Sequence, residues 1–292
     1  MQTKCNMEKL IDLGKYIEYG INKLEENFSG LWGAVDDTIT WTVDSMNDLF
    51  LSFPFYVIIV LVTLGTYYAN TGKKAFTKEG LKKGAGMTIF VVFGLLLIAA
   101  MGYWEESIQT TTLVLVSTFI ALLFSIPLGI WAARNKTADM IIRPVLDFMQ
   151  TMPAFVYLIP AIFFFSVGNT PGVVATVIFS LPPAVRLTSL GIKNVPSDVI
   201  EAGRAFGATE KQILFKIQLP LAKPTILAGI NQVILLALSM VVIASMVGAK
   251  GLGSVVYQGI QQNDVAKGFE SGLGIVILAI ILDRITQSIA KK

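Results

Sequence analysis

Long apolar runs separated by short polar segments make up most of the chain beyond residue 52. A helix that crosses a bilayer needs about 20 predominantly apolar residues. Seven runs come close to that length, and they cover residues 53–69, 86–103, 111–133, 146–167, 173–190, 222–246 and 271–289. This pattern predicts an all-α integral membrane protein with about seven transmembrane helices.

The fourth and fifth runs each contain two prolines, Pro153 and Pro160 in the first case and Pro182 and Pro183 in the second. Proline interrupts helices in water, but inside a helix bundle the neighbouring helices satisfy the carbonyl groups that it frees. We therefore expect helices in both runs, and we expect these two helices to bend.

The first 52 residues show a different pattern. Apolar residues recur there at three- and four-residue steps, which is typical of an amphipathic helix. They are Leu10, Leu13, Ile17, Ile21 and Leu24, followed by Trp32, Ile39 and Trp41. The segment also holds nine acidic residues against four lysines. We expect an external amphipathic helix on the outer membrane face, with a loosely structured tail as the alternative.

The composition supports a membrane protein and excludes several kinds of chemistry. Hydrophobic residues make up 54% of the chain and charged residues 15%, whereas charged residues are about a quarter of an ordinary soluble domain. The chain has no histidine and a single cysteine, Cys5. A histidine acid–base centre, a Cys/His metal site and an internal disulfide are therefore excluded, and nothing in the sequence indicates a nucleic-acid partner.

Basic residues indicate the orientation, because they are enriched in cytoplasmic loops. If residues 191–221 are cytoplasmic, fifteen Lys and Arg residues lie inside, whereas the three short outer loops near residues 104–110, 168–172 and 247–270 hold only Lys250 and Lys267. The inner ones are Lys73, Lys74, Lys78, Lys82, Lys83, Arg134, Lys136, Arg143, Lys193, Arg204, Lys211, Lys216, Lys223, Lys291 and Lys292. This distribution predicts a multi-pass protein of the cell membrane with its N-terminus outside and its C-terminus in the cytoplasm.

The segment 191–221 contains helix start and stop signals in close succession. Pro196-Ser197-Asp198 can end one helix and cap another over about residues 199–206. Gly207 can adopt a positive φ, and Thr209 with Gln212 forms a second capping pattern. Leu219 precedes a proline, which disfavours helix there. These signals predict a helix, a glycine turn, a second helix and a stop at Pro220.

The same segment carries a motif, Glu201-Ala202-Gly203, a glycine at Gly207 and then Ile217-Gln218-Leu219-Pro220. This spacing resembles the cytoplasmic signature loop of the permeases of ABC importers, and we call residues 191–221 the coupling loop. The resemblance implies that Glu201, Ala202, Gly203, Gly207, Ile217, Leu219 and Pro220 dock onto a separate ATP-binding subunit. Gly203 departs from the signature, which commonly has alanine, and glycine lowers helix stability by about 1 kcal/mol.

The resemblance covers residues 106–292, the five-helix core of type I permeases similar to the methionine permease. It makes residues 53–105 two additional helices and residues 1–52 an external tail. The sequence segments 150–157 and 182–188 resemble those of the glycine betaine and proline betaine permeases of osmoprotectant uptake systems. The resemblance implies a homodimer in the lipid bilayer, with ATP bound by partner subunits and an external protein that delivers the solute. No cofactor is expected in this chain.

Candidate residues for a translocation path are polar or aromatic residues inside the spans. Asn231, Gln232 and Ser239 are uncharged and lie in the middle of the sixth run, where pore lining and hydrogen bonding between helices are equally good interpretations. Phe155 and Tyr157 are further candidates, together with Phe163, Phe164, Phe165 and Phe179, although helix packing is the commoner role of such residues. Asp147, Arg186, Asp283 and Arg284 lie near the cytoplasmic ends of their runs, where they can reach water or pair.

Residues 248–254, Gly-Ala-Lys-Gly-Leu-Gly-Ser, only superficially resemble a phosphate-binding loop. The Lys-Ser/Thr ending is missing and no other segment matches Gly, four residues, Gly-Lys-Ser/Thr, so the chain is not expected to be an ATPase. Three other classes stay open. They are an ion-coupled secondary transporter, which would need inverted repeats, a membrane enzyme, and an ABC permease for methionine, taurine or phosphonate.

Overall fold

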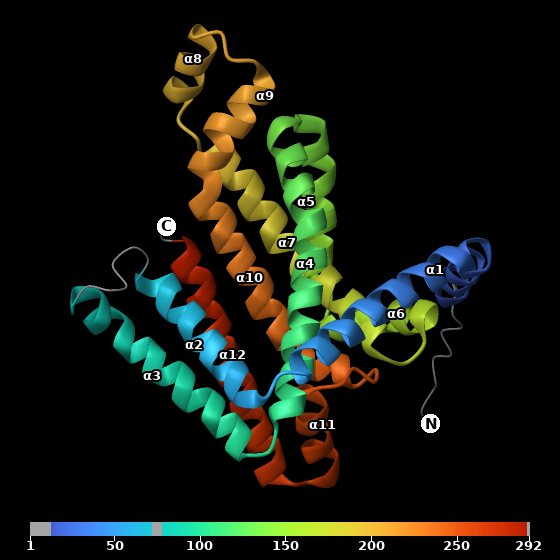
Figure 1. Cartoon of the computed structure of the whole chain (residues 1–292). Coiled ribbons are helices and arrows are strands. Elements are labelled where there is room, and N and C mark those ends of the chain that lie inside the picture. The colour runs from blue at the N-terminus through green and yellow to red at the C-terminus, as the bar shows by residue number, and fades with distance from the viewer. Residues whose placement is uncertain (1–12, 72–77, 291–292) are drawn as a thin grey trace, which may run out of the picture.

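The computed structural model describes residues 13–71 and 78–290, and within these residues it contains helices and no strand (Figure 1). The long helices are α1 (Leu13–Leu51), α2 (Phe55–Thr71), α3 (Lys78–Ala100), α4 (Trp104–Arg134), α5 (Lys136–Thr151), α7 (Asn169–Lys193), α10 (Leu219–Ser245) and α12 (Val265–Ala290). Shorter ones are η2 (Ala154–Tyr157), α6 (Leu158–Phe165), α8 (Ser197–Ala205), α9 (Glu210–Gln212), the π-helical η3 (Ile213–Gln218) and α11 (Leu252–Gln262). The prediction of an all-α chain is confirmed.

Helices α4, α7 and α10 form the centre of the molecule (Figure 1). They approach closely because glycines lie where they cross. A Cβ atom on Gly129 of α4 would come within 2.6 Å of Thr188 Cβ on α7, and one on Gly229 of α10 would come within 3.2 Å of Leu187 Cβ. Membrane helices associate through such small residues, because lipid offers no hydrophobic driving force between them.

Two groups of helices flank this centre on opposite sides (Figure 1). Helices α2, α3 and α12 share an apolar cluster that includes Ile59, Val91 and Ile277. Helix α1 packs against α4, α6 and α7. The centroid of its Trp32 ring lies 4.4 Å from the centroid of the Phe164 ring on α6. The expected amphipathic segment is thus helical from Leu13 onward, whereas Leu10 and Cys5 lie outside the described residues.

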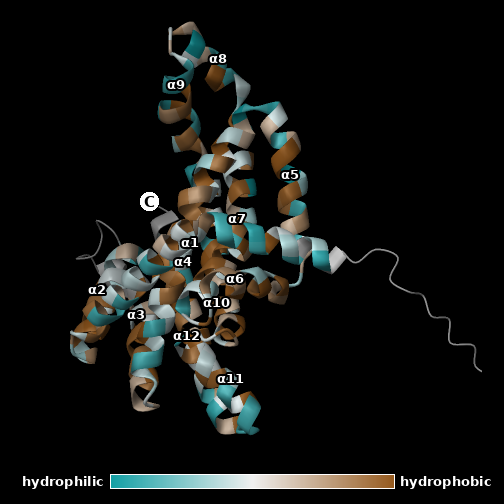
Figure 2. Cartoon of the chain, turned by 90° about the vertical axis from the view of Figure 1, so that its right-hand side faces the viewer, coloured by the Kyte–Doolittle hydropathy of each residue, from teal (hydrophilic) through white to brown (hydrophobic). Residues whose placement is uncertain are grey.

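The structure does not confirm the seven membrane spans expected. Four described helices, α4, α7, the combined α9–η3–α10 segment and α12, are long and apolar enough to cross a membrane, and the number rises to six if each of two bent pairs is one span. One pair joins α1 to α2 with a bend of 100°. Figure 2 shows hydrophilic residues gathered on α8 and on α11, at opposite ends of the molecule.

The second bent pair corrects the expected helix over residues 146–167. The chain breaks between α5 and η2, and the two parts are bent by 108°. Met152 has the extended dihedrals φ −72° and ψ 134°, because the residue before a proline avoids the helical region. The fourth run therefore bends as expected. By contrast, α7 runs unbroken through Pro182 and Pro183, where it is buried between α4 and α10.

Candidate functional site

The coupling loop projects beyond the ends of α7 and α10 as a separate knob built from α8, α9 and η3 (Figure 1). Helix α8 starts at Ser197 directly after Pro196, and no side chain caps it. The expectation that a side chain of Pro196-Ser197-Asp198 caps this helix is therefore wrong, because Ser197 and Asp198 already lie inside the first turn. There the Asp198 carboxylate favours the helix through the macrodipole.

Gly207 reverses the chain after α8. Its φ is +77°, and the amide of Ala208 donates to the carbonyl of Gly203 while the amide of Gly207 donates to that of Arg204. This pair of bonds is the Schellman motif, in which the residue after the helix adopts a left-handed conformation. The predicted glycine turn is confirmed. It gives the knob a defined shape.

The second helix of the knob begins with the predicted capping box. The Thr209 amide donates to Gln212 Oε1 at 2.8 Å, and the Gln212 amide donates to Thr209 Oγ1 at 3.4 Å. The predicted stop at Pro220 is wrong, because η3 continues into α10. The helix widens to a π turn just before this proline, with the Leu219 amide bonded to the Leu214 carbonyl, and the missing amide of Pro220 is accommodated there.

The knob has a buried base and an exposed tip. Ile213 and Leu214 are buried at the base. At the tip, Glu201, Ala202 and Gly207 are exposed, and Phe206 exposes 92% of its surface. Phe206 is therefore available for contact with another surface.

Gly203, the departure from the signature, lies against Ile217 of η3. A Cβ atom on this residue would lie 2.6 Å from the Cδ1 atom of Ile217. Cδ1 is the flexible end of this side chain, so an alanine at position 203 would require Ile217 to shift. Leu219 and Pro220 lie where the knob joins α10, and Pro220 is exposed.

A three-residue ion network, which the sequence did not predict, joins the knob to α4. Glu210 Oε2 lies 2.7 Å from Arg134 Nη2 at the end of α4, and Glu210 Oε1 lies 3.0 Å from Arg204 Nη2 on α8. No sequence signal links Arg134 to a residue 76 positions away, because nothing in the local pattern says which helix ends meet in space.

The polar candidates on α10 separate into two kinds. Asn231 donates to Asp283 Oδ1 on α12 at 2.8 Å. It therefore forms a hydrogen bond between helices, which was one of the two interpretations of this residue. Gln232 and Ser239 are exposed on α10, and the Ser239 hydroxyl donates to the Leu235 carbonyl within its own helix. Their side chains therefore face out of this single chain, toward lipid, a path or a second copy.

The aromatic candidates also divide. Tyr157 is buried, its hydroxyl donates to the Met149 carbonyl, and its ring meets Phe179 edge-on. These contacts brace the break between α5 and α6. Phe155 and Phe163 are exposed, whereas Phe164 and Phe165 pack against Trp32.

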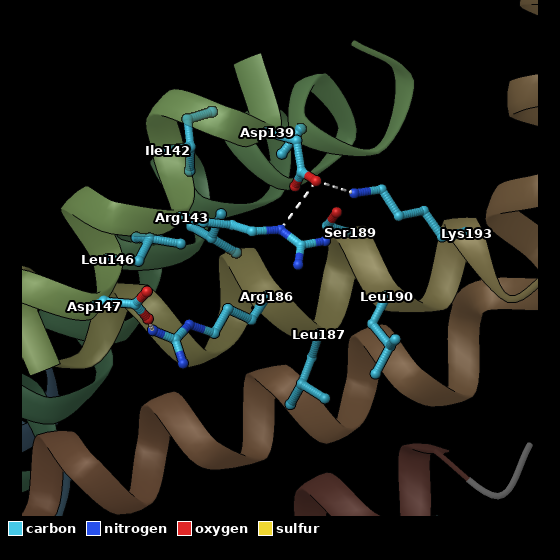
Figure 3. Close-up of a pocket in the computed structure, with 12 residues that line it drawn as sticks. Asp139, Ile142, Arg143, Leu146, Asp147, Arg186, Leu187, Ser189, Leu190 and Lys193 are labelled. Carbon is cyan, nitrogen blue, oxygen red and sulfur yellow. Dashed lines mark hydrogen bonds and ion pairs between the residues drawn. The ribbon is translucent and has the colours of Figure 1, made fainter. Parts of the chain in front are cut away.

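Charged residues also line a cavity of about 310 Å³ between α5 and α7 (Figure 3). Asp139 lies between Arg143 at 2.9 Å and Lys193 at 2.8 Å, and Arg186 pairs with Asp147. Pairing was one of the two roles expected for Asp147 and Arg186, the other being contact with water. The Lys193 and Arg186 pairs join α7 to α5.

The fold and the knob together define a class, a membrane protein with several apolar helices long enough to span a bilayer and a helical knob that projects from one end. Comparison with known proteins makes the family specific. Residues 125–292, more than half of the chain, match the family model described as "Binding-protein-dependent transport system inner membrane component". The chain belongs to this family.

Two curated relatives are similar over much of the chain. It is 49% identical over 282 residues to the glycine betaine/carnitine transport permease protein GbuB of Listeria monocytogenes serotype 1/2a (strain 10403S), covering 97% of this chain and 96% of the relative. It is 59% identical over 207 residues to the glycine betaine transport system permease protein OpuAB of Bacillus subtilis (strain 168), covering 71% of this chain and 73% of the relative.

A solved structure supports the fold. An inward-facing structure of the MetNI methionine ABC transporter aligns with a TM-score of 0.61 and 22% sequence identity, over 65% of this chain and 94% of that chain. The architecture is therefore that of a type I ABC permease.

Proposed function

We propose that this chain is the membrane permease of an ATP-driven importer that moves glycine betaine, or a similar small quaternary ammonium solute, into the cell for osmoprotection. The observation that carries the proposal is the identity of 59% and 49% to two permeases whose names both include glycine betaine. At such identity over most of the chain, the permeases share their core, so a shared solute class follows most simply.

We propose that a separate subunit binds and hydrolyses ATP and that the coupling loop docks onto it. The exposed Phe206 at the tip of a rigid knob supports this role, because aromatic anchors dominate interface energetics. The chain supplies the path and a mechanical lever. ATP binding in the partner would displace the knob and thereby change the packing of the central helices.

The orientation and the assembly follow from the same proposal. The coupling loop faces the cytoplasm where ATP is present, so the N-terminal segment lies outside, as the distribution of basic residues indicates. Two copies of this chain pair around a shared path, and an external binding protein delivers the solute. The exposed Gln232 and Ser239 support a seam on this face of α10, because polar groups are unfavourable in lipid.

The solute is recognised tightly outside the membrane and weakly within it. A zwitterion has no net charge and needs no counter-ion in the path. A strongly binding counter-ion there would slow the release of the solute. A cage of aromatic rings that binds quaternary ammonium through cation–π attraction belongs to the binding protein.

Uptake by the assembled system in proteoliposomes with internal ATP tests this proposal. Labelled glycine betaine should accumulate, and unlabelled proline betaine should compete with it whereas methionine and taurine should not. Accumulation of methionine instead would contradict the solute assignment and keep the permease assignment. Accumulation that follows an ion gradient without ATP would contradict both.

A further inference from the structure

The coupling loop is covalently joined only to α7 and α10, yet Glu210 connects it to a third helix. Arg134, the last residue of α4, donates from Nη2 to the Glu210 carboxylate at 2.7 Å and from Nη1 to the Glu210 backbone carbonyl at 3.0 Å. One guanidinium therefore holds both the side chain and the backbone of the same residue.

Arg204 of α8 binds the other carboxylate oxygen of Glu210. Its Nη2 and Nε atoms lie 3.0 and 3.2 Å from Oε1. The Thr209–Gln212 capping box fixes the backbone directly beside Glu210. A single carboxylate thus bridges α4, α8 and the start of α9.

This network is better suited to positioning than to stability. The side chains of Arg134, Arg204 and Glu210 expose 31%, 56% and 56% of their surfaces, and exposed ion pairs stabilise a fold little. However, each guanidinium is planar and donates two bonds to Glu210, and two bonds from a planar group restrict its direction more than one bond does. The geometry therefore defines how the knob is oriented relative to the end of α4.

Apolar contacts beneath the network connect the same elements. Ile130 and Ala133 of α4 pack against a buried cluster of Ile192, Leu214 and Ala222, which belong to α7, η3 and α10. Helix α4 in turn packs along α7, and more weakly along α10 and α1. A movement of α4 therefore reaches most of the central bundle.

We propose that Glu210 is a positioning residue that locks the coupling loop to α4, so that a displacement of the knob moves α4 together with α7 and α10. This inference rests on the proposed docking of the knob to an ATP-binding subunit. It adds a specific prediction. Loss of the network should uncouple transport from ATP hydrolysis without releasing the ATP-binding subunit.

The test compares Glu210→Ala, Arg134→Gln and the double variant in the complete transporter in proteoliposomes. ATP hydrolysis and glycine betaine uptake are measured in the same vesicles, and assembly is measured by co-purification of the ATP-binding subunit. We expect normal assembly, continued hydrolysis, and a fall in uptake per ATP of about tenfold in each single variant. The double variant should lose no more than Arg134→Gln alone, because that variant already removes both bonds between Arg134 and Glu210.

Arg143→Gln serves as the matched control. It removes an exposed ion pair on the neighbouring α5, while Asp139 keeps its contact with Lys193, and it should leave uptake per ATP unchanged. An unchanged ratio in Glu210→Ala, or losses that multiply in the double variant, would overturn the inference. Failure of Glu210→Ala to retain the ATP-binding subunit would also overturn it, because Glu210 would then be a docking residue. Failure of the unmodified chain to bind that subunit would instead refute the proposed function.

Discussion

Phe206 is the residue on which docking should depend most. It is the most exposed large apolar side chain of the knob, and the Schellman turn that follows holds it at the tip. Phe206→Ala should weaken binding of the ATP-binding subunit by about 2 kcal/mol, as expected for an aromatic anchor. Phe206→Tyr should retain most of the affinity. Titration of the subunit onto the purified permease measures both, and equal affinities for the alanine variant and the unmodified chain would contradict an anchoring role.

The effect of a substitution at Gly207 should depend on whether the new residue can adopt a positive φ, and not on the size of its side chain. No atom lies within 4 Å of the position of an added Cβ, but its φ of +77° is a left-handed conformation. Gly207→Val should therefore distort the turn, at a cost of about 1–2 kcal/mol, and reduce ATP-driven uptake. Gly207→Asn should be tolerated, because asparagine adopts this conformation readily. Equal activity of the two variants would show that the turn geometry does not matter for docking.

At the scale of elements, α1 is attached to the bundle partly through two aromatic contacts of Trp32. The Trp32 ring lies 4.4 Å from Phe164 and 5.9 Å from Phe165, both on α6. Trp32→Ala should loosen this attachment by about 1 kcal/mol, so that hydrogen exchange in α1 becomes faster. Trp41→Ala, which alters an exposed tryptophan on the same helix, is the control and should have no such effect. Equal exchange in both variants would contradict the proposed attachment.

The coupling loop and the proline-containing helices show which features of this fold a sequence can predict. The glycine turn at Gly207 and the Thr209–Gln212 capping box are local, because the side chains and dihedrals that define them lie within a few residues. The stop at Pro220 was mispredicted because a π turn absorbs the proline. The contrast between the break at Pro153 and the unbroken α7 depends on neighbouring helices. The Arg134–Glu210 contact depends on the tertiary fold, which no local pattern contains.

At the scale of the whole molecule, the proposed orientation places the two ends of the chain on opposite sides of the membrane. Cys5 is the only thiol, so it should react in intact cells with a thiol reagent that cannot cross membranes. A cysteine introduced by Lys78→Cys, in a chain with Cys5→Ser, should stay unlabelled until the membrane is opened. Mass spectrometry of the labelled protein reads out both. The reverse pattern would invert the orientation and place the coupling loop outside.

The central claim is that the knob at one end of this permease binds an ATP-hydrolysing subunit, and site-specific cross-linking tests it most directly. A photoreactive amino acid is placed either at position 206, at the tip of the knob, or at position 269. Phe269 is exposed in the first turns of α12. This part of α12 follows α11, at the end of the molecule opposite the knob (Figure 1). After illumination of membranes that contain the whole transporter, position 206 should form an adduct with the ATP-binding subunit and position 269 should not. An adduct from position 269, or none from position 206, would contradict the account.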